Sequence, residues 1–282
     1  MSMTALVSAF ARAYHTRREG AKIFDDKYAR LLLSTEEHEQ IGAHMASGVS
    51  FFDPAFRGDA GDALRRVMDR YLSPTPLART AFAAEELARS GAEQVLSLAA
   101  GYDTVGYDSG LPLFEADRPE VLADKQARLR RADLMTAALH FVPADLSQPG
   151  WAAQVTAAGF DKERPTFCAV MGLSYYLTEE EMSLLLREAS SLLPRGSRVV
   201  LDVPIAAQRC QGALTAQAGE AMEAVYDSGI LGRMARSCGL HLALYLTPQD
   251  IQARFFDPYN TEVEGCPMYA PADVAYCVLT RA

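Results

Sequence analysis

The sequence has no run of apolar residues close to the roughly 20 that a membrane-spanning helix needs. Its opening stretch, MSMTALVSAFARAYHTRREG, has neither a charged leader nor a long apolar core, so we expect no secretory signal there. The five cysteines form no CxxC pair, which is typical of buried thiols in a reducing compartment, and no HExxH motif indicates a metal site. These absences predict a cytoplasmic protein that has neither a metal nor a membrane span.

Excess positive charge is also missing. The net charge is −9, so nothing indicates a nucleic-acid partner. We interpret the one basic cluster, Arg128, Arg130 and Arg131, as the solvated face of a helix. A chain of 282 residues, 49% hydrophobic and 22% charged, is long enough for one large α/β domain with an appended subdomain, or for two small domains.

Strand patterns are absent from residues 1–90, where apolar residues recur at helical spacing and predict a helical N-terminal lid. Strands and helices alternate beyond it. A capping-box pattern at Thr178 and Glu181 predicts a helix start. The predicted strands are residues 94–100, 111–117, 139–145, 166–172, 197–203, 240–246 and 274–280.

Near-continuous apolar strands separated by helices predict a Rossmann-like, mostly parallel seven-stranded sheet covered on both faces. We therefore expect a single α/β domain over residues 1–282. Its parts are a lid (1–90), a cofactor-binding half (91–203), a helical insertion (204–240) and C-terminal strands (241–282).

The turn after the first strand lacks a glycine that phosphate-binding loops need. Gly101 follows the strand, which should end near Ala100, but Asp103 replaces the second glycine of GxGxxG. A ligand without phosphates needs only close backbone approach and a carboxylate. S-adenosylmethionine is such a ligand, so the turn favours it over a dinucleotide.

Acidic residues follow three successive predicted strands. Asp103 follows the first strand, Asp117 ends the second, sixteen residues after Gly101, and Asp145 ends the third. A carboxylate at the end of the second strand can accept hydrogen bonds from both ribose hydroxyls. Asp145 can accept from an adenine amino group. The three acids together indicate a nucleoside site at the carboxyl edge of the sheet.

At this point the sequence resembles the leucine carboxyl methyltransferase family, in particular its bacterial S-adenosylmethionine-dependent O-methyltransferases, which are similar to enzymes that methylate carboxylates in polyketide pathways. LAAGYDT resembles the family's GAGLDTR, and FEADRPEVLADKQARL resembles its FEVDxPxVxxxK stretch. ARAYHTRREGAKIFDDKYARLLL and LART resemble the N-terminal helix and the helix before the first strand. The resemblance covers nearly the whole chain and implies a class I methyltransferase of secondary metabolism.

The resemblance implies roles for individual residues of this sequence. Arg79 would bind the carboxylate of the methionine moiety, Asp117 would hold the ribose, and Asp145 and Leu146 would flank the adenine. The candidate cofactor-binding residues are Arg79, Ala100, Gly101, Asp103, Asp117, Asp145, Leu146 and Met171.

Two positions depart from the family pattern. Val105 stands where the family has an arginine, and Met171 stands where a glutamate near the cofactor is usual. The two changes together are consistent with a lost ion pair that is compensated internally, with weakened cofactor affinity, or with altered chemistry.

The acceptor is expected to be a small, partly apolar molecule. A carboxylate acceptor is already ionised at pH 7 and is favoured, whereas a hydroxyl acceptor would need a general base. Tyr175 and Tyr176 follow the fourth strand, and His15 lies in the lid, so these three are the candidate catalytic residues. Each has an alternative role in packing.

The lid and the insertion would shape the acceptor pocket, and Arg17 or Arg18 would either close over it or form a surface salt bridge. We expect a monomer or a homodimer. GLSYY lacks the last glycine of the hydrolase motif GxSxG, which argues against a hydrolase. The remaining rival is a methyltransferase fold repurposed as a ligand-binding protein or as a catalyst that does not transfer a methyl group.

Overall fold

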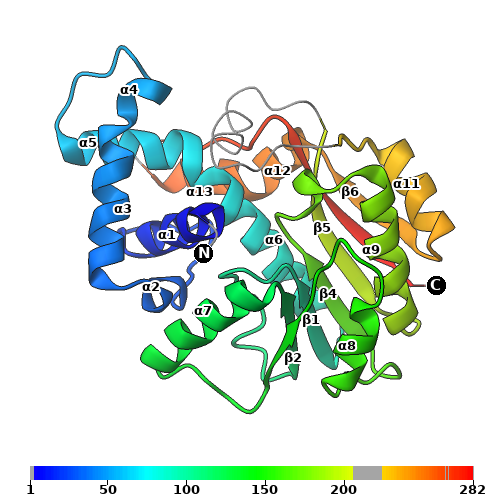
Figure 1. Cartoon of the computed structure of the whole chain (residues 1–282). Helices are drawn as coiled ribbons and strands as arrows, with labels where there is room; N and C mark the ends of the chain where they lie inside the picture. The colour runs from blue at the N-terminus through cyan, green and yellow to red at the C-terminus, as the bar shows by residue number, and fades with distance from the viewer. Residues whose placement is uncertain (1–2, 206–223, 264, 266, 282) are drawn as a thin grey trace.

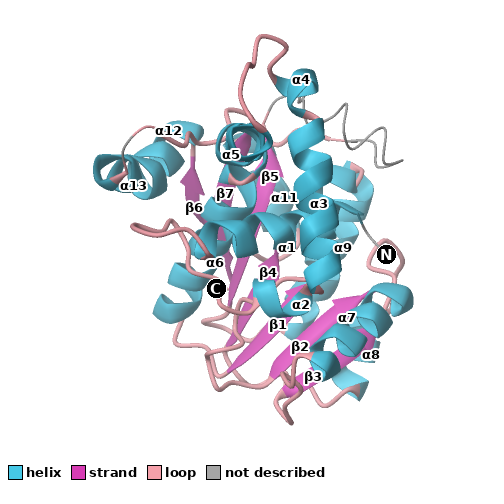
Figure 2. Ribbon diagram, turned by 90° about the vertical axis from the view of Figure 1, so that its left-hand side faces the viewer, coloured by secondary structure: helices cyan, strands magenta, loops and turns pink. Residues whose placement is uncertain are grey.

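A seven-stranded sheet forms the centre of the computed structural model, which describes residues 3–205, 224–263, 265 and 267–281 (Figures 1 and 2). Each strand falls on a stretch predicted from the sequence. The strands are β1 (Gln94–Leu98), β2 (Leu113–Asp117), β3 (Leu139–Pro143), β4 (Thr166–Val170), β5 (Arg198–Pro204), β6 (His241–Leu246) and β7 (Val274–Thr280).

The strand order is β3-β2-β1-β4-β5-β7-β6, and all neighbours are parallel except β7, which runs antiparallel to β5 and β6. The order reverses between β1 and β4, with β1 paired to β2 on one side and to β4 on the other. Ligands of open α/β sheets bind at this reversal, beyond the carboxyl ends of the strands. The expected Rossmann-like class is confirmed, and its ligand edge lies at the ends of β1, β2 and β4.

Helices cover both faces of the sheet, as near-continuous apolar strands require. One face packs against α8 (Trp151–Ala157), α9 (Glu179–Leu192) and α11 (Ser228–Ser237), with Trp151 fully buried there. The other face packs against α6 (Pro74–Arg89) and the π-helical η3 (Gln252–Phe256). The helix α7 (Pro119–Arg131) follows β2, and the capping box of α9 at Thr178 and Glu181 is formed as predicted.

The N-terminal residues are helical, as predicted, and pack over the carboxyl edge of the sheet (Figure 1). A separate apolar cluster joins this lid to Tyr102 of the turn after β1 and to Leu129 of α7. The lid elements are α1 (Met3–Thr16), α2 (Ala29–Leu32), α3 (Thr35–Ser47), α4 (Val49–Phe52), α5 (Ala60–Val67) and the π-helical η1 (Met68–Leu72).

The interpretation of the basic cluster as a solvated face is wrong for Arg128. Its side chain is 4% exposed, and its guanidinium donates to both carboxylate oxygens of Glu37 on α3 and to the Leu32 carbonyl oxygen. Arg131 also donates to the Leu32 carbonyl oxygen. The reason is tertiary: the lid brings an acid and a helix end onto this face of α7, so the arginines dock the lid there.

Part of the predicted insertion, residues 206–223, lies outside the described residues, and the rest includes α11. The segment predicted as C-terminal strands also contains helices between β6 and β7. These are α12 (Pro248–Ile251), η3 and α13 (Asp257–Glu262). In the described part of the chain, no helix is long and apolar enough to cross a membrane.

Candidate active site

The turn after β1 has an unusual backbone. Ala99 has a φ of 54° and Gly101 a φ of 43°, both in the left-handed region that glycine tolerates best. A Cβ on Gly101 would lie 3.5 Å from the Ala5 side chain of α1, so the lid helix approaches this backbone closely. A non-glycine residue such as Ala99 in this conformation indicates strain of the kind found at ligand sites.

Asp117 fixes the turn to the neighbouring strand. Its Oδ2 accepts a 2.7 Å hydrogen bond from the Gly101 amide, and its Oδ1 accepts one from the Arg118 amide. The residue is 8% exposed. A carboxylate has about four lone-pair sites, so both oxygens keep the capacity to accept from a ligand. The structure thus brings together two of the residues predicted to bind the cofactor.

Asp103 forms hydrogen bonds within the turn, and the buried ion pair of Lys125 and Glu115 contacts the turn backbone. Oδ1 of Asp103 accepts from the amides of Thr104 and Val105. The Lys125 ammonium, with no exposed surface, donates to the Asp103 carbonyl oxygen at 2.8 Å and to Oε1 of Glu115 at 2.7 Å. Glu115 and Lys125 both come from the stretch FEADRPEVLADK, so this motif holds the turn in place.

Arg79 lies between the lid and the ends of β4 and β5. Its Nη2 donates to Oγ of Ser8 on α1 at 3.0 Å, and its Nη1 lies 3.7 Å from Oδ2 of Asp202. The side chain of Arg79 is 20% exposed and that of Asp202 is fully buried. Burial opposes the charge on Arg79, but Asp202, together with Tyr175, Asp103 and Tyr276, outweighs burial and raises the pKa of Arg79.

Asp202 also holds the turn that follows β4. Oδ1 accepts a 2.6 Å hydrogen bond from the Gly172 amide, and Oδ2 accepts a 2.9 Å hydrogen bond from the Tyr175 hydroxyl. The hydroxyl of Ser174 donates to the Asp202 carbonyl oxygen. Ser174, the serine of GLSYY, therefore binds the backbone of β5 in this structure.

The two candidate catalytic tyrosines have different surroundings. Tyr175 is 5% exposed and its hydroxyl is bonded to the buried carboxylate of Asp202. Tyr176 is half-buried, with its ring 6.3 Å from that of Tyr175. Tyr175 therefore has a packing role, and the role of Tyr176 at the acceptor stays a prediction.

His15 is buried on the inner side of α1. Its Nε2 accepts from the Ile23 amide at 3.0 Å, and its ring lies 5.5 Å from that of Tyr259. Burial, together with the charges of Lys22 and Arg18, lowers the pKa of His15 to about 3. An imidazole with this pKa is a weak base, and its Nε2 is already occupied.

The remaining predicted residues lie around the same edge. Asp145 is exposed and its Oδ1 accepts from the amide and the hydroxyl of Ser147, while Leu146 is buried. Ala100 is buried, and its carbonyl oxygen accepts from the Asp103 amide. Met171 is partly buried against apolar residues of the α6 face.

The lid contacts the turn through an arginine that sequence reasoning did not select. Arg12 of α1 donates to the Tyr102 carbonyl oxygen at 2.6 Å and to Oδ2 of Asp26 at 2.7 Å. The same Asp26 oxygen accepts from the Thr104 hydroxyl at 2.8 Å. Arg18, one of the two expected lid arginines, instead donates to both oxygens of Asp69 on η1.

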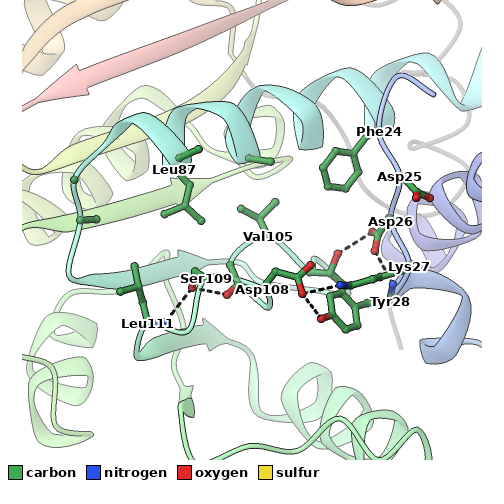
Figure 3. Close-up of a pocket in the computed structure, with 16 residues that line it drawn as sticks. Phe24, Asp25, Asp26, Lys27, Tyr28, Leu87, Val105, Asp108, Ser109 and Leu111 are labelled. Atoms are coloured by element: carbon green, nitrogen blue, oxygen red, sulfur yellow. Dashed lines mark hydrogen bonds and ion pairs between the residues drawn. The ribbon is translucent and has the colours of Figure 1, made fainter. Parts of the chain in front are cut away.

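A cavity of about 560 Å³ lies beside the turn, between residues 24–28, the C-terminal half of α6 and residues 104–111 (Figure 3). Leu87, Val105 and Phe24 contribute its apolar walls, and Asp108, paired with Lys27, lies at its side. None of the predicted cofactor-binding residues lines it. Because Val105 does, the departure from the family's arginine lies at this cavity, on the α6 side of the turn.

Sequence reasoning missed three residues of the site: Arg12, Lys125 and Asp202. Two of them carried a signal. Lys125 is the lysine of FEADRPEVLADK, the stretch that resembles the family pattern, and Asp202 is a charge within the apolar run VVLDV. A charged residue on a core-facing position is expected to have a partner. The identity of that partner was not readable without the fold.

Comparison with known proteins relates this chain to S-adenosylmethionine-dependent methyltransferases. A family model described as leucine carboxyl methyltransferase matches residues 5–190. A curated Bacillus subtilis protein named "Putative S-adenosyl-L-methionine-dependent methyltransferase YktD" is 33% identical over 278 residues, covering 90% of this chain and 91% of its own.

Two solved structures share the fold. One, a DUF574 family protein from Streptomyces avermitilis, aligns with a TM-score of 0.58 at 16% identity and covers 90% of this chain and 95% of its own. The other, magnesium protoporphyrin IX methyltransferase from Synechocystis with bound S-adenosylhomocysteine, aligns with a TM-score of 0.50 at 11% identity, covering 86% and 99%. At these identities the likeness concerns the fold alone.

Proposed function

Because the chain belongs to the leucine carboxyl methyltransferase family, we propose that it transfers a methyl group from S-adenosylmethionine to an oxygen of a small molecule, with a carboxylate favoured as acceptor. Family membership confirms the enzyme class and the cofactor expected from the sequence. When bound, S-adenosylmethionine supplies an electrophilic methyl group on a sulfonium. The acceptor class and the residues that act on it belong to the proposal.

The observation that carries the proposal is the set of opposite charges at the carboxyl edge of β1, β2 and β4. Asp117, bonded to the Gly101 amide, supplies a carboxylate for the ribose, and Arg79 supplies a cation for the methionine carboxylate. Asp145 and Leu146 follow β3 on the adenine side. These residue types match a nucleoside that carries an amino acid.

The character of His15 favours a carboxylate over a hydroxyl acceptor. A phenol or an alcohol must lose a proton, and a general base works best with a pKa near the working pH. The pKa of His15 is about 3 and its Nε2 is bonded to the Ile23 amide. A carboxylate is already ionised at pH 7, so it needs orientation and exclusion of water but no base.

The test uses S-adenosylmethionine with a labelled methyl group and matched pairs of small acceptors, each pair a carboxylic acid and the corresponding alcohol or phenol. We expect label in the acid product, released as methanol by mild base, because an ester hydrolyses where an ether does not. A base-stable labelled product would contradict the carboxylate assignment. Asp117→Ala is the control and should reduce transfer to every acceptor alike at a subsaturating concentration of S-adenosylmethionine.

Met171 is the observation that supports a second candidate function. This side chain is partly buried among apolar residues, at the position where the family resemblance implies a glutamate near the cofactor, which is consistent with a fold that binds its ligand without methyl transfer. Calorimetry with S-adenosylmethionine and S-adenosylhomocysteine, followed by the transfer assay, separates the two. Tight binding without transfer to any acceptor would favour the second function. A lack of binding at millimolar concentration would contradict both.

The family resemblance also supports proposals for the cellular location, the pathway class and the assembly state. We propose a cytoplasmic enzyme of secondary metabolism, acting on a small partly apolar acid related to polyketides, as a monomer or a homodimer. Sedimentation of the purified chain would fix its assembly state, and the identity of the methylated product would test the pathway class.

A further inference from the structure

Gly172, at the turn after β4, has a backbone and surroundings that concern Arg79. Its φ is +75°, and a Cβ built on it would stand 2.5 Å from Nη1 of Arg79, 3.1 Å from Cζ and 3.3 Å from Nη2. The guanidinium therefore lies directly against the bare Cα of this glycine. No other residue type leaves that space, because even alanine would place a methyl group inside the contact distance.

The turn that carries Gly172 is itself fixed. Its amide donates to Oδ1 of the fully buried Asp202, whose Oδ2 accepts from the Tyr175 hydroxyl and lies 3.7 Å from the guanidinium. The Asp202 carboxylate thus orients the glycine backbone and attracts the arginine at the same time. The guanidinium is held by three features: the flat surface of Gly172, the charge of Asp202 and the hydroxyl of Ser8 on α1.

We propose that Gly172 is a positioning residue that sets where the Arg79 guanidinium meets the carboxylate of the cofactor. The inference rests on the proposed role of Arg79 as the anchor of that carboxylate. Bidentate recognition of a carboxylate by arginine depends on the placement and orientation of a planar fork. A displacement of the fork by the space of one methyl group therefore weakens recognition of this one part of the ligand.

Gly172→Ala tests the proposal because the atoms in the way are the end of a flexible side chain. The new Cβ moves Arg79 and does not meet backbone, so the fold persists apart from the strain of a positive φ. Gly196→Ala is the matched control. Gly196 has a φ of +86°, and a Cβ built on it meets no atom within 4 Å, so this variant carries the same strain without the contact.

Two ligands report on different parts of the site: S-adenosylhomocysteine, which has the amino-acid carboxylate, and 5′-methylthioadenosine, which shares the nucleoside and lacks the amino acid. By calorimetry, Gly172→Ala should raise the Kd of S-adenosylhomocysteine about tenfold or more, the size of one charge-assisted hydrogen bond. The Kd of methylthioadenosine should stay unchanged, and Gly196→Ala should change neither value. In an Arg79→Ala background, adding Gly172→Ala should have no further effect.

The outcomes separate this proposal from the function on which it rests. If Arg79→Ala weakens S-adenosylhomocysteine binding and Gly172→Ala does not, Gly172 is not a positioning residue, while the proposed function stands. An equal loss for both ligands in Gly172→Ala would mean that the Cβ disturbs the whole turn, and would also overturn the proposal. If Arg79→Ala leaves binding unchanged, or the wild-type chain binds neither ligand, the proposed site fails and the role of Gly172 fails with it.

Discussion

The amide of Gly101 donates a 2.7 Å hydrogen bond to Oδ2 of Asp117, which joins the turn after β1 to the end of β2. The carboxylate proposed to hold the ribose therefore also fixes the backbone that approaches the cofactor. Loss of this one side chain should affect both parts of the site at once.

Asp117→Ala should raise the Kd of S-adenosylmethionine by about an order of magnitude or more, because two charge-assisted hydrogen bonds to the ribose are lost. Calorimetry measures this directly. Asp108→Ala is a control, since Asp108 is exposed, pairs with Lys27 and lies at the cavity that none of the predicted cofactor-binding residues lines. Equal affinities of the Asp117 variant and the wild type would show that the ribose lies elsewhere.

The pair of Arg128 and Glu37 docks the lid, and it predicts a pH dependence. The hydrogen bond from Arg128 lowers the pKa of Glu37 from its ordinary 4.5 to about 2. The ionised form is thus favoured in the folded state, so the stabilisation is complete above about pH 4.5 and is lost as the pH falls towards 2.

Glu37→Gln should reduce the free energy of unfolding by about 1–3 kcal/mol at neutral pH, the usual worth of hydrogen bonds to a charged group. Thermal unfolding measured from pH 7 to pH 2.5 should show the two proteins converging at the acidic end. A difference that stayed constant with pH would contradict the assignment. Glu36→Gln, on an exposed neighbour of the same helix, is the matched control.

Changing Tyr175 and Tyr176 to phenylalanine, one at a time, should have different effects on stability and turnover. Tyr175→Phe removes the hydroxyl bonded to the buried Asp202, so it should lower the free energy of unfolding by about 1.5–3 kcal/mol. Tyr176→Phe should change stability less, because its ring is only half-buried. On our proposal that Tyr176 contacts the acceptor, the same variant should change turnover more. The melting temperature and kcat of both variants test this prediction. A larger loss of stability in Tyr176→Phe and a larger loss of turnover in Tyr175→Phe would contradict it.

His15 predicts a second pH effect, at milder acidity. Burial lowers the pKa of His15 from its ordinary 6.5 to about 3, so between these values the unfolded chain binds a proton that the folded chain does not. Stability contributed by the neutral ring is therefore complete above about pH 6.5 and declines as the pH falls towards 3.

His15→Gln keeps an acceptor for the Ile23 amide and removes the titration. Its free energy of unfolding should depend less on pH between 6.5 and 4 than that of the wild type, and an equal dependence would contradict the assignment. If His15 were the catalytic base, the same variant would abolish methyl transfer. Retained transfer would leave it a structural role.

Much of the fold was readable along the chain because its signals are local. Apolar runs gave all seven strands, and the capping box at Thr178 gave the start of α9. The antiparallel β7 and the helices between β6 and β7 were not predicted. Both depend on which strand edge the chain returns to, and pairing across the sheet leaves no local pattern.

The family, the enzyme class and the cofactor follow from the sequence alone, because spaced motifs and strand-end acids lie along the chain. Which polar and charged groups contact one another depends on the tertiary structure. It joined Asp202 to Arg79 and Tyr175, Arg128 to Glu37, and Arg12 to the turn after β1. The partners are separated by 27 to 123 positions along the chain. Attractions between charges that far apart in sequence exist only after the layers pack, and they fix the geometry of the site.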